Sequence, residues 1–386
     1  MAAKTAAGPT PAYADPIAPQ VDVNDYLRTQ TMRVGTDTIT WASGSATAPS
    51  RARSRFVLPK VGLLSRLYID IDAVSATGYD LTIGAGAAAA AADGRGPFQI
   101  VDGVTVKVNG GSGWYDVSGF GTYIVNAVEA ADAYPDTGTP GTAYATAPTA
   151  IATTLKNYPV AADGRPRFGL EVPFCLGPSN PLGMLLLQND LTTVELEIRW
   201  GSLDAYAALT GGAVATLTLT ATVIAEVFDI PPADAFGAFF RPMLRWGHWW
   251  REERQDVTAS GRGANIVSLD NHDTYLRVFH TLMRNSVLNT DNIDDVRFVL
   301  NRNHTLFDHD DATHFRRQRK NVGKDVPVVL HDFFATGTLR AVIHADAYTD
   351  IRSEIDLSSV AGTNWLLTAT EKLVDLGEPG AGAAVA

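Results

Sequence analysis

Cysteine is almost absent from the sequence, with Cys175 as the single one among 386 residues. One cysteine cannot close an intrachain disulfide, and it can ligate a metal only together with residues of other types. Charged residues are also scarce at 19%, whereas 46% of the residues are hydrophobic. We therefore expect stability to come from apolar burial and from partner chains, and Cys175 to be a free buried thiol.

Positive charge is in deficit, because the formal net charge is −11 and the pI is about 5.1. Nucleic-acid binding depends on Lys and Arg that neutralise phosphates, so no direct contact with nucleic acid is expected. Long apolar runs are missing too, since Gly84–Ala92 holds only Gly and Ala and is far shorter than the ~20 apolar residues of a membrane span. Residues 1–16 lack the apolar centre of a secretory signal, which predicts a soluble protein without export.

Motifs of known catalytic chemistry are missing as well. The sequence contains no GxSxG nucleophile elbow, no phosphate-binding Walker loop and no Ser/His/Asp or Cys/His signature. Gly110–Gly113 follow a predicted strand, but no helical pattern comes after them, so they predict a tight turn. The acidic pairs Asp70/Asp72 and Glu195/Glu197 are expected on water-exposed strand faces. We predict no enzymatic activity and no cofactor.

Alternation of apolar and polar residues with period two runs through the chain, and it indicates half-buried β-strands. The segment 193–200 is the clearest case, because Val194, Leu196, Ile198 and Trp200 share one side. So many short strands with turn-rich spacing predict sandwiches or barrels. The other predicted strands are 36–41, 55–58, 67–72, 104–108, 122–128, 168–174, 183–187, 216–223, 245–251, 275–282, 296–301, 326–330, 339–344 and 364–374.

Two segments, 84–97 and 129–166, lack this periodicity and are rich in Ala, Gly and Thr. Loops of such length usually carry a function or face a partner, although solvated loops without consequence are the alternative. Helices are few. Acids at 308–311, bases at 316–320 and Gly323 just beyond them follow the order of helix start, end and stop signals. A short helix capped by Asp22 is also predicted over 22–30.

The chain is longer than a single hydrophobic core usually allows, so about two domains are expected. The segment 201–213, which contains Gly211-Gly212, is the best boundary, and the strand at 216–223 would open the second domain. We predict an amino-terminal arm or short helix at 1–30, a first β-domain at 31–200, a linker at 201–213, a second β-domain at 214–376 and a flexible tail at 377–386.

Acids and histidines crowd one segment, with His304, His309 and His314 among Asp308, Asp310 and Asp311. A metal site is one hypothesis, but His309 and His314 are five positions apart, whereas ligands on one helix face prefer three or four. We favour helix-start acids with surface histidines, and predict no metal. The run Arg316–Lys320 has no interleaved aromatics, so we expect a basic helix end and not a nucleic-acid patch.

Large aromatic residues gather shortly after the predicted linker. The candidate packing or subunit-interface anchors are Trp246, Trp249, Trp250, Phe239 and Phe240. Aromatic residues and Arg dominate interface energetics, which favours a self-associating protein. The alternative is a carbohydrate-stacking platform, made by the tryptophans with His248, in a sugar-binding or carbohydrate-active β-sandwich.

Two segments carry a resemblance to a known family. They are 53–73, RSRFVLPKVGLLSRLYIDIDA, and 173–200, PFCLGPSNPLGMLLLQNDLTTVELEIRW. In the second, a strand, a Gly-Pro-Ser-Asn turn and a long alternating strand are similar to the closing strands of a first jelly roll. The chain thereby resembles the double jelly-roll major capsid proteins of tail-less viruses with an internal membrane, such as the tectivirus-like phages. The similarity of pattern covers most of 30–375.

The resemblance implies an all-β fold of two tandem eight-stranded jelly rolls with long loops and a few short helices. It implies a structural protein whose homotrimers form pseudo-hexagonal capsomers that tile an icosahedral virion shell. Implied partners are neighbouring capsomers, penton and minor capsid proteins, and the internal membrane through the amino-terminal segment. Synthesis in the host cytoplasm and residence in the virion follow. A minor capsid or spike protein is the alternative.

We expect Trp249→Ala or Trp250→Ala to impair folding or trimerisation, because each removes a large aromatic anchor. Size-exclusion chromatography with light scattering measures the outcome. Variants that still form normal trimers would count against these anchors.

Overall fold

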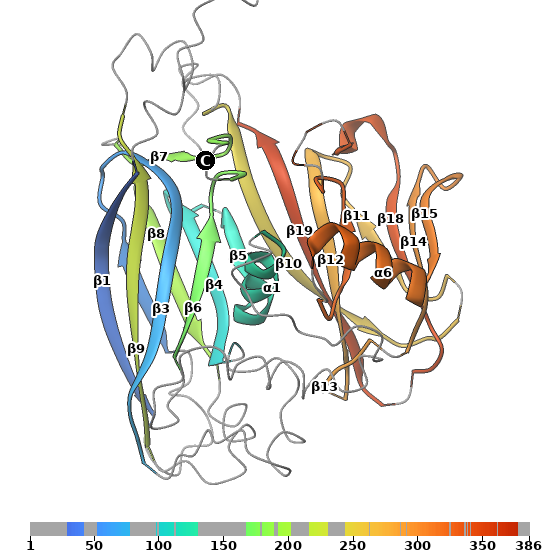
Figure 1. Ribbon diagram of the computed structural model, residues 1–386, viewed down its shortest axis with the longest axis horizontal. Coiled ribbons are helices and arrows are strands. Elements are labelled where there is room, and N and C mark those ends of the chain that lie inside the picture. Colours follow the sequence, from blue (N-terminus) through green and yellow to red (C-terminus); the bar gives the residue numbers. More distant parts are fainter. Residues whose placement is uncertain are drawn as a thin grey trace, which may run out of the picture.

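Most of the described residues lie in β-strands, which form three sheets (Figure 1). In this part of the chain there are two α-helices, α1 (Gly119–Glu129) and α6 (Asp311–Val322), and no helix with the length and apolarity needed to cross a membrane. The structure is a computed structural model, which describes residues 29–41, 52–77, 98, 100–111, 113–129, 167–177, 180–188, 192–201, 216–230, 244–261, 263–285, 287–290, 292–323, 326–335, 337, 339, 341–360 and 362–376.

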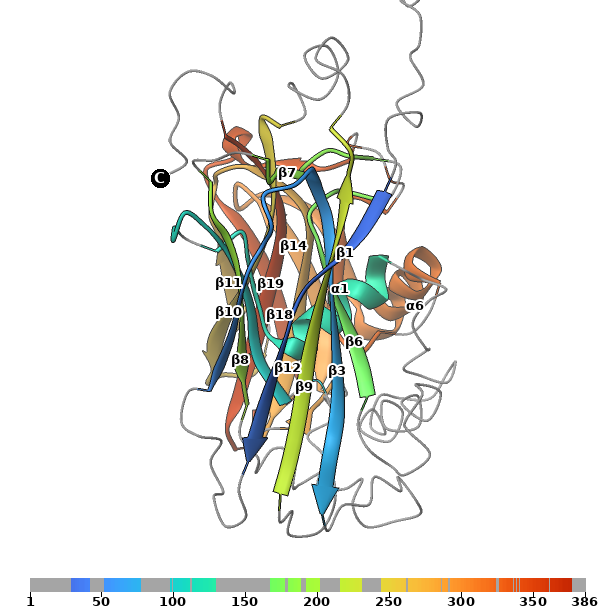
Figure 2. The ribbon, with the colours of Figure 1, turned by 90° about the vertical axis from the view of Figure 1, so that its left-hand side faces the viewer.

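The first sheet is antiparallel and forms one outer wall of the molecule. Its strand order is β1 (Thr29–Trp41), β9 (Thr216–Phe228), β3 (Leu63–Thr77) and β6 (Arg167–Pro173), with the short β7 (Leu185–Leu186) also paired to β3. Figure 2 looks onto this wall, where β1, β9 and β3 run side by side. Threonine hydroxyls face each other across β1 and β9, with Thr38 and Thr220 oxygens 3.1 Å apart.

The second sheet is the largest and runs through both halves of the molecule. Its order is β13 (Val287–Leu288), β12 (Thr274–Arg284), β19 (Asn364–Asp375), β10 (Trp246–Val257), β5 (Tyr115–Val117), β4 (Val101–Val108), β8 (Val194–Trp200) and β2 (Arg53–Val57), while β16 (Val329–Asp332) and β17 (Ile343–His344) also pair with β12. The halves meet where β10 pairs with β5 in parallel, Trp250 opposite Tyr115 and Arg251 opposite Asp116.

The third sheet completes the second half, in the order β11 (Ile266–Leu269), β18 (Ile351–Leu357), β14 (Ile293–Leu300) and β15 (His304–Asp310). A short 3-10 helix, η6 (Ala345–Ala347), precedes β18. The large sheet contributes to two sandwiches. Its strands β5, β4, β8 and β2 pack against the first sheet to make the first sandwich. Its strands β10, β19 and β12 pack against the third sheet to make the second. The two sandwiches stand side by side in Figure 1.

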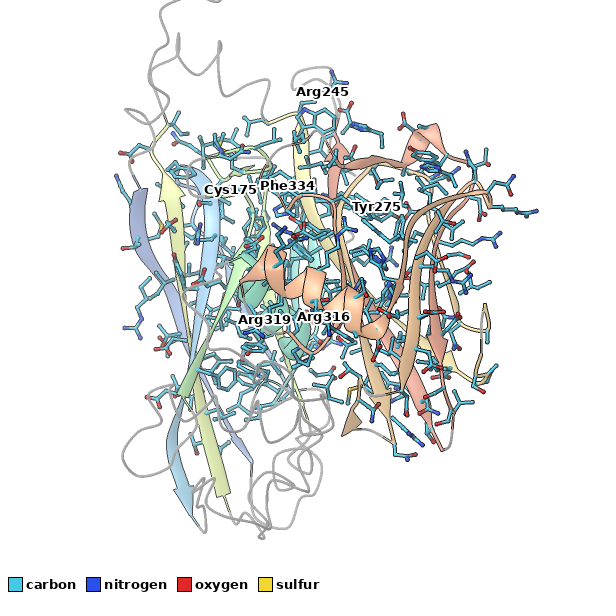
Figure 3. The ribbon with its side chains drawn as sticks, turned by 45° about the vertical axis from the view of Figure 1, so that its right-hand side comes forward. Cys175, Arg245, Tyr275, Arg316, Arg319 and Phe334 are labelled. Atoms are coloured by element: carbon cyan, nitrogen blue, oxygen red, sulfur yellow. The ribbon has the colours of Figure 1, made fainter. Side chains whose placement is uncertain are left out.

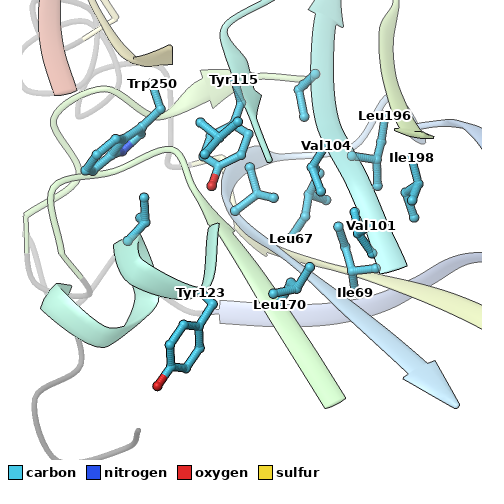
Figure 4. Close-up of a cluster of buried hydrophobic side chains, with 14 of the residues drawn as sticks. Leu67, Ile69, Val101, Val104, Tyr115, Tyr123, Leu170, Leu196, Ile198 and Trp250 are labelled. Atoms are coloured by element: carbon cyan, nitrogen blue, oxygen red, sulfur yellow. The ribbon is translucent and has the colours of Figure 1, made fainter. Parts of the chain in front are cut away.

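The first sandwich is filled by the apolar faces of its strands. Leu67 and Ile69 of β3 lie opposite Val104, Leu196 and Ile198 of the large sheet, all at most 1% exposed (Figure 4). The alternation predicted for β8 is therefore confirmed for its apolar side. A side chain of this kind gains roughly 1.5–3 kcal/mol when it is fully buried, so the sandwich interior is the main source of stability.

The polar side of β8 differs from its expectation, because Glu197 is buried and not exposed to water. Its carboxylate lies 2.8 Å from Arg53 Nη1 and 3.6 Å from Lys107 Nζ, on the two neighbouring strands. Cross-strand partners on β2 and β4 cover the carboxylate and pair with it. The alternation correctly separates the apolar side of β8 from its polar side. It does not predict the burial of Glu197, because the side chains that cover this carboxylate are distant in sequence.

The predicted strand at 122–128 is wrong, since these residues belong to α1. Every residue from Gly119 to Val128 is buried, so the helix has no polar side to produce a helical period. The Ser118 hydroxyl accepts a hydrogen bond from Gly121 N at 3.0 Å at the start of the helix. A Cβ at Gly119 would lie 2.4 Å from the Phe98 carbonyl oxygen, so the close approach of α1 to the strands requires glycine.

The strand predicted at 216–223 exists as part of β9, but its expected place in the second domain is wrong. β9 lies between β1 and β3 and closes the first sandwich. The alternating pattern defines a strand without defining its partners, which here lie up to 199 positions away in sequence. Because the first sandwich extends to Phe228, we propose that the division between the halves falls within 229–245.

The helix predicted from the acids at 308–311 is confirmed, with Asp310 as its cap. The Asp310 carboxylate accepts a hydrogen bond from Thr313 N at 2.7 Å, and Gly323 ends the helix with a φ of 82°. Residues 304–310 form β15 and not a helical turn. Residues 29 and 30, predicted as helix, begin β1, and the other predictions for the arm 1–28, most of the linker, the segments 84–97 and 130–166, and the tail 377–386 lie outside the described residues.

Candidate functional site

The tryptophans of β10 do not form one platform. Trp246, His248 and Trp250 fall on one side of the strand and Trp249 on the other. Trp250 is 1% exposed, with its ring centroid 6.1 Å from that of Phe279, so no sugar ring can stack on it. The tryptophans of β10 therefore do not form the shared, exposed stacking surface that the carbohydrate hypothesis requires.

Each tryptophan has a separate environment. Trp249 is half-buried with its ring 6.1 Å from that of Trp114, and Trp246 is half-buried below the guanidinium of Arg245. Trp250 is a packing residue between the sandwiches. Phe239 and Phe240 lie outside the described residues, and a role of the aromatic residues at a subunit interface stays a prediction.

Five ionisable side chains meet where the two sandwiches touch, and we call them the junction cluster: Glu129, His248, Arg277, Asp332 and Glu371. Arg277 is central, with Nη1 2.9 Å from Glu371 Oε2 and Nε 3.4 Å from Asp332 Oδ1. The same Nη1 lies 3.7 Å from Glu129 Oε1, which belongs to α1 of the first sandwich. His248 Nε2 is 2.8 Å from the other oxygen of Glu371.

Most of the junction cluster is withdrawn from water, and Glu129 is its exposed member. His248 and Glu371 are 1% exposed and Arg277 is 9% exposed. Burial raises the pKa of Glu129 to about 8, and the Glu371 charge adds to this effect. Burial alone would raise the pKa of Glu371 too, but Arg277 and His248 hold it below its usual range. This cluster leaves no recognisable pattern in the sequence, because its members are up to 242 positions apart and share no motif.

Replacing Arg277 tests how strongly the junction cluster depends on its guanidinium. We expect Arg277→Met to lower the free energy of unfolding by about 3–5 kcal/mol, because it leaves buried carboxylates without their cation. Urea denaturation of the purified protein measures the loss. Arg251→Met is the matched control, since the Arg251 side chain is 73% exposed, and should change stability by less than about 0.5 kcal/mol. Equal losses would contradict the prediction.

Three buried histidines form a second group, the histidine cluster: His280 of β12, His314 of α6 and His331 of β16. The ring centroid of His331 lies 5.7 Å from each of the other two. His280 Nδ1 is 2.9 Å from Thr368 Oγ1, and His331 Nε2 is 2.9 Å from Ser353 Oγ. The prediction of surface histidines is wrong for His314, because α6 directs His314, Gln318 and Val322 toward the sheets.

Burial disfavours the charged form of all three imidazoles. It lowers the pKa of His280 to about 3 and that of His314 to about 4, and the pKa of His331 falls well below its usual value. The neighbouring charges add to this effect. All three rings are thus neutral at pH 7. Protonating any of them places a charge in the buried contact between α6 and the sheets.

The histidine cluster predicts loss of stability in acid. An unfolded His takes up a proton near pH 6.5 and the folded one does not, so the free energy of unfolding falls as the pH drops from about 6.5 toward 4. Each neutral buried His contributes up to about 1.4 kcal/mol per pH unit to this slope. We expect His280→Gln to remove one such contribution.

Urea denaturation between pH 7 and pH 4 measures the slope. His304→Gln is the control, because His304 is exposed on β15 and should leave the slope unchanged. An unaltered slope in His280→Gln would contradict the assignment.

The basic run at the end of α6 lies on the surface of the second sandwich (Figure 3). The Arg317 guanidinium stands 4.7 Å from the Phe307 ring centroid, and its Nη1 donates to His309 Nε2 at 3.0 Å. Arg319 and Lys320 occupy the last turn, where they oppose the helix dipole. The helix-end interpretation of this run agrees with its position.

A cleft of about 640 Å³ lies beside β10. Its lining comes mainly from β10, β11 and β19 and includes Trp249, Arg251 and Glu253, together with Asp116 of the first sandwich. Lys372 lies deeper, with Nζ 2.6 Å from Asp270 Oδ1 and 4.5 Å from the Tyr275 ring centroid. The cleft walls carry charges of both signs.

Cys175 is a free buried thiol, as predicted. Its Sγ lies 3.3 Å from Ser65 Oγ, and burial raises its pKa. A thiol in this state is a poor nucleophile.

The fold is similar to those of solved viral capsid proteins, although no similar sequence was found. No family model and no curated protein sequence matches the chain. Among solved structures, the major capsid protein of Sulfolobus turreted icosahedral virus is 13% identical with a TM-score of 0.59, over 92% of this chain and 99% of that chain. The PBCV-1 virus capsid protein is 9% identical with a TM-score of 0.55, over 90% and 94%.

The major capsid protein of bacteriophage PM2 is 10% identical with a TM-score of 0.51, over 90% of this chain and 98% of that chain. Identities this low show the fold alone. The predicted fold class, all-β with two jelly rolls in tandem, is confirmed.

Proposed function

We propose, from the fold that it shares with viral major capsid proteins, that this chain is the major capsid protein of a tail-less icosahedral virus. Its activity is association and not catalysis. The observation that carries the proposal is the full-length correspondence of a double sandwich, which covers at least 90% of this chain and of each of the three capsid proteins compared.

The shape of the subunit supports a trimeric capsomer. Two sandwiches stand side by side in one chain (Figure 1). Three copies around a threefold axis place six sandwiches in a ring, which gives a pseudo-hexagonal outline from identical chains. Such units fill a surface in the way that hexagons do, so a single gene product can tile most of a shell.

The edge of the second sandwich supports controlled contact between copies. Within the described residues, the outer edge of β10 has no partner strand after Arg251. An open edge invites uncontrolled pairing unless charges restrict it. Arg251, Glu253 and Arg254 are exposed there, with side chains 73%, 66% and 55% accessible. Charges of both signs along the cleft suit a complementary surface of a neighbouring copy.

In the proposed virion, the shell lies over an internal membrane that the amino-terminal segment approaches. Penton and minor capsid proteins occupy the positions that trimers leave open. A net charge of −11 supports a shell that does not bind the genome directly. The chain is made in the host cytoplasm and resides in the virion.

Two other functions were considered. A sugar-binding or carbohydrate-active sandwich has little support, because Trp250 and His248 are buried and the tryptophans point to opposite sides of β10. A minor capsid or spike protein shares the fold argument and differs in assembly. Negative-stain microscopy separates the two, since only a major capsid protein should give abundant trimers of pseudo-hexagonal outline.

Solution mass tests the proposal directly. Three chains of 41.2 kDa give about 124 kDa, and we expect light scattering to report this mass for the purified protein. A stable monomer, or a dimer that does not convert to larger species with concentration, would contradict the trimer.

A further inference from the structure

The junction cluster contains a group of side chains with the arrangement of metal ligands. One ligand atom each of Glu129, His248 and Glu371 lies within 4.8 Å of the others. Glu129 comes from the last turn of α1, His248 from β10 and Glu371 from β19. The three groups thus converge from both sandwiches on the contact between them.

The charges of the cluster do not balance. Glu129, Asp332 and Glu371 are three carboxylates, and Arg277 is the cation that contacts all of them. The cluster therefore has two more carboxylates than guanidinium groups. Glu371 and His248 are buried, and burying a charge without a partner is costly, so a divalent cation at this point would offset the excess of carboxylates.

The donors indicate which cation fits. An imidazole nitrogen with two carboxylate oxygens is typical of Zn²⁺ and related transition metals, whereas Ca²⁺ and Mg²⁺ prefer oxygen donors alone. His248 is 1% exposed and directs Nε2 into the cluster, while its Nδ1 has no hydrogen-bond partner among the described residues. The ring is therefore buried with only one of its two nitrogens engaged.

We propose that Glu129, His248 and Glu371 bind a divalent transition-metal ion, with Zn²⁺ as the representative, and that this ion ties the two sandwiches together. The added charge of two balances the cluster. Arg277 contacts the Oε2 atom of Glu371, which leaves Oε1, the oxygen facing His248, for the metal. A water molecule completes four-coordination.

Small movements are enough to form the site. Zn²⁺ bonds of about 2.1 Å place tetrahedral ligand atoms roughly 3.4 Å apart. His248 Nε2 and Glu371 Oε1 must separate slightly from their 2.8 Å contact, and Glu129 must approach them. The Glu129 side chain is 24% exposed at the end of a helix, so it has the freedom to do so.

Calorimetric titration of the full-length protein with ZnCl₂, after treatment with EDTA and dialysis, tests the proposal. We expect one Zn²⁺ per chain, and a rise in melting temperature that EDTA reverses. Glu129→Gln keeps the shape of the side chain but removes a ligand charge, and should weaken binding at least about ten-fold. His248→Asn is the second ligand variant, with the same expectation.

The control is Glu253→Gln, which removes a 66% exposed carboxylate elsewhere on β10 and should bind Zn²⁺ like the unmodified chain. Three results would overturn the proposal: no saturable binding, binding by Glu129→Gln as tight as by the control, or a preference for Ca²⁺ over Zn²⁺. In the first case the contact between the sandwiches depends on its side chains alone and holds no metal ion.

Discussion

The contact between the sandwiches determines how the two halves of the molecule are arranged. It consists of a short parallel pairing of β10 with β5, the buried helix α1 beside it, and Trp250 packed across the boundary. These elements make the two sandwiches share one sheet and one apolar cluster, in which Trp250, Phe279 and Ala369 of the second half join the core of the first. The halves are therefore joined by shared packing as well as by the chain that connects them.

Polar groups at this contact add specificity to the apolar packing. Glu252 of β10 accepts from Ser118 N at 2.6 Å just before α1, and Arg277 reaches Glu129 at the other end of that helix. Buried polar contacts of this kind stabilise less than apolar packing of the same volume, but they permit few alternative alignments. These contacts therefore restrict the angle between the two sandwiches.

Much of the fold could be predicted from the sequence, because half-buried strands impose a local pattern. The alternation in β8, the caps of α6 at Asp310 and Gly323, and the free thiol of Cys175 each depend on neighbours within a few residues or on composition. The helix α1 could not be recognised, since it is buried on all sides. The place of β9 could not be recognised either, since pairing partners leave no local trace.

The candidate site was harder to predict than the fold. His314 shows no sign of burial in its own segment, because the rings that surround it come from β12 and β16. Glu129, Arg277 and Glu371 are ordinary members of their helix and strands until the sandwiches meet. Clusters of this kind are a property of the tertiary contact, so only a structure reveals them.

During synthesis β1 is complete long before β9, the strand with which it pairs. Thr29 lies opposite Phe228, so β1 leaves the ribosome about two hundred residues before the strand that covers its edge. At roughly 5–20 residues per second this interval is on the order of 10–40 seconds. Throughout it, the threonine-rich β1 lacks the strand that covers one of its edges in the sheet. Threonine hydroxyls on its face can hydrogen-bond water during this interval, which makes the unpaired strand more soluble than valine or isoleucine would.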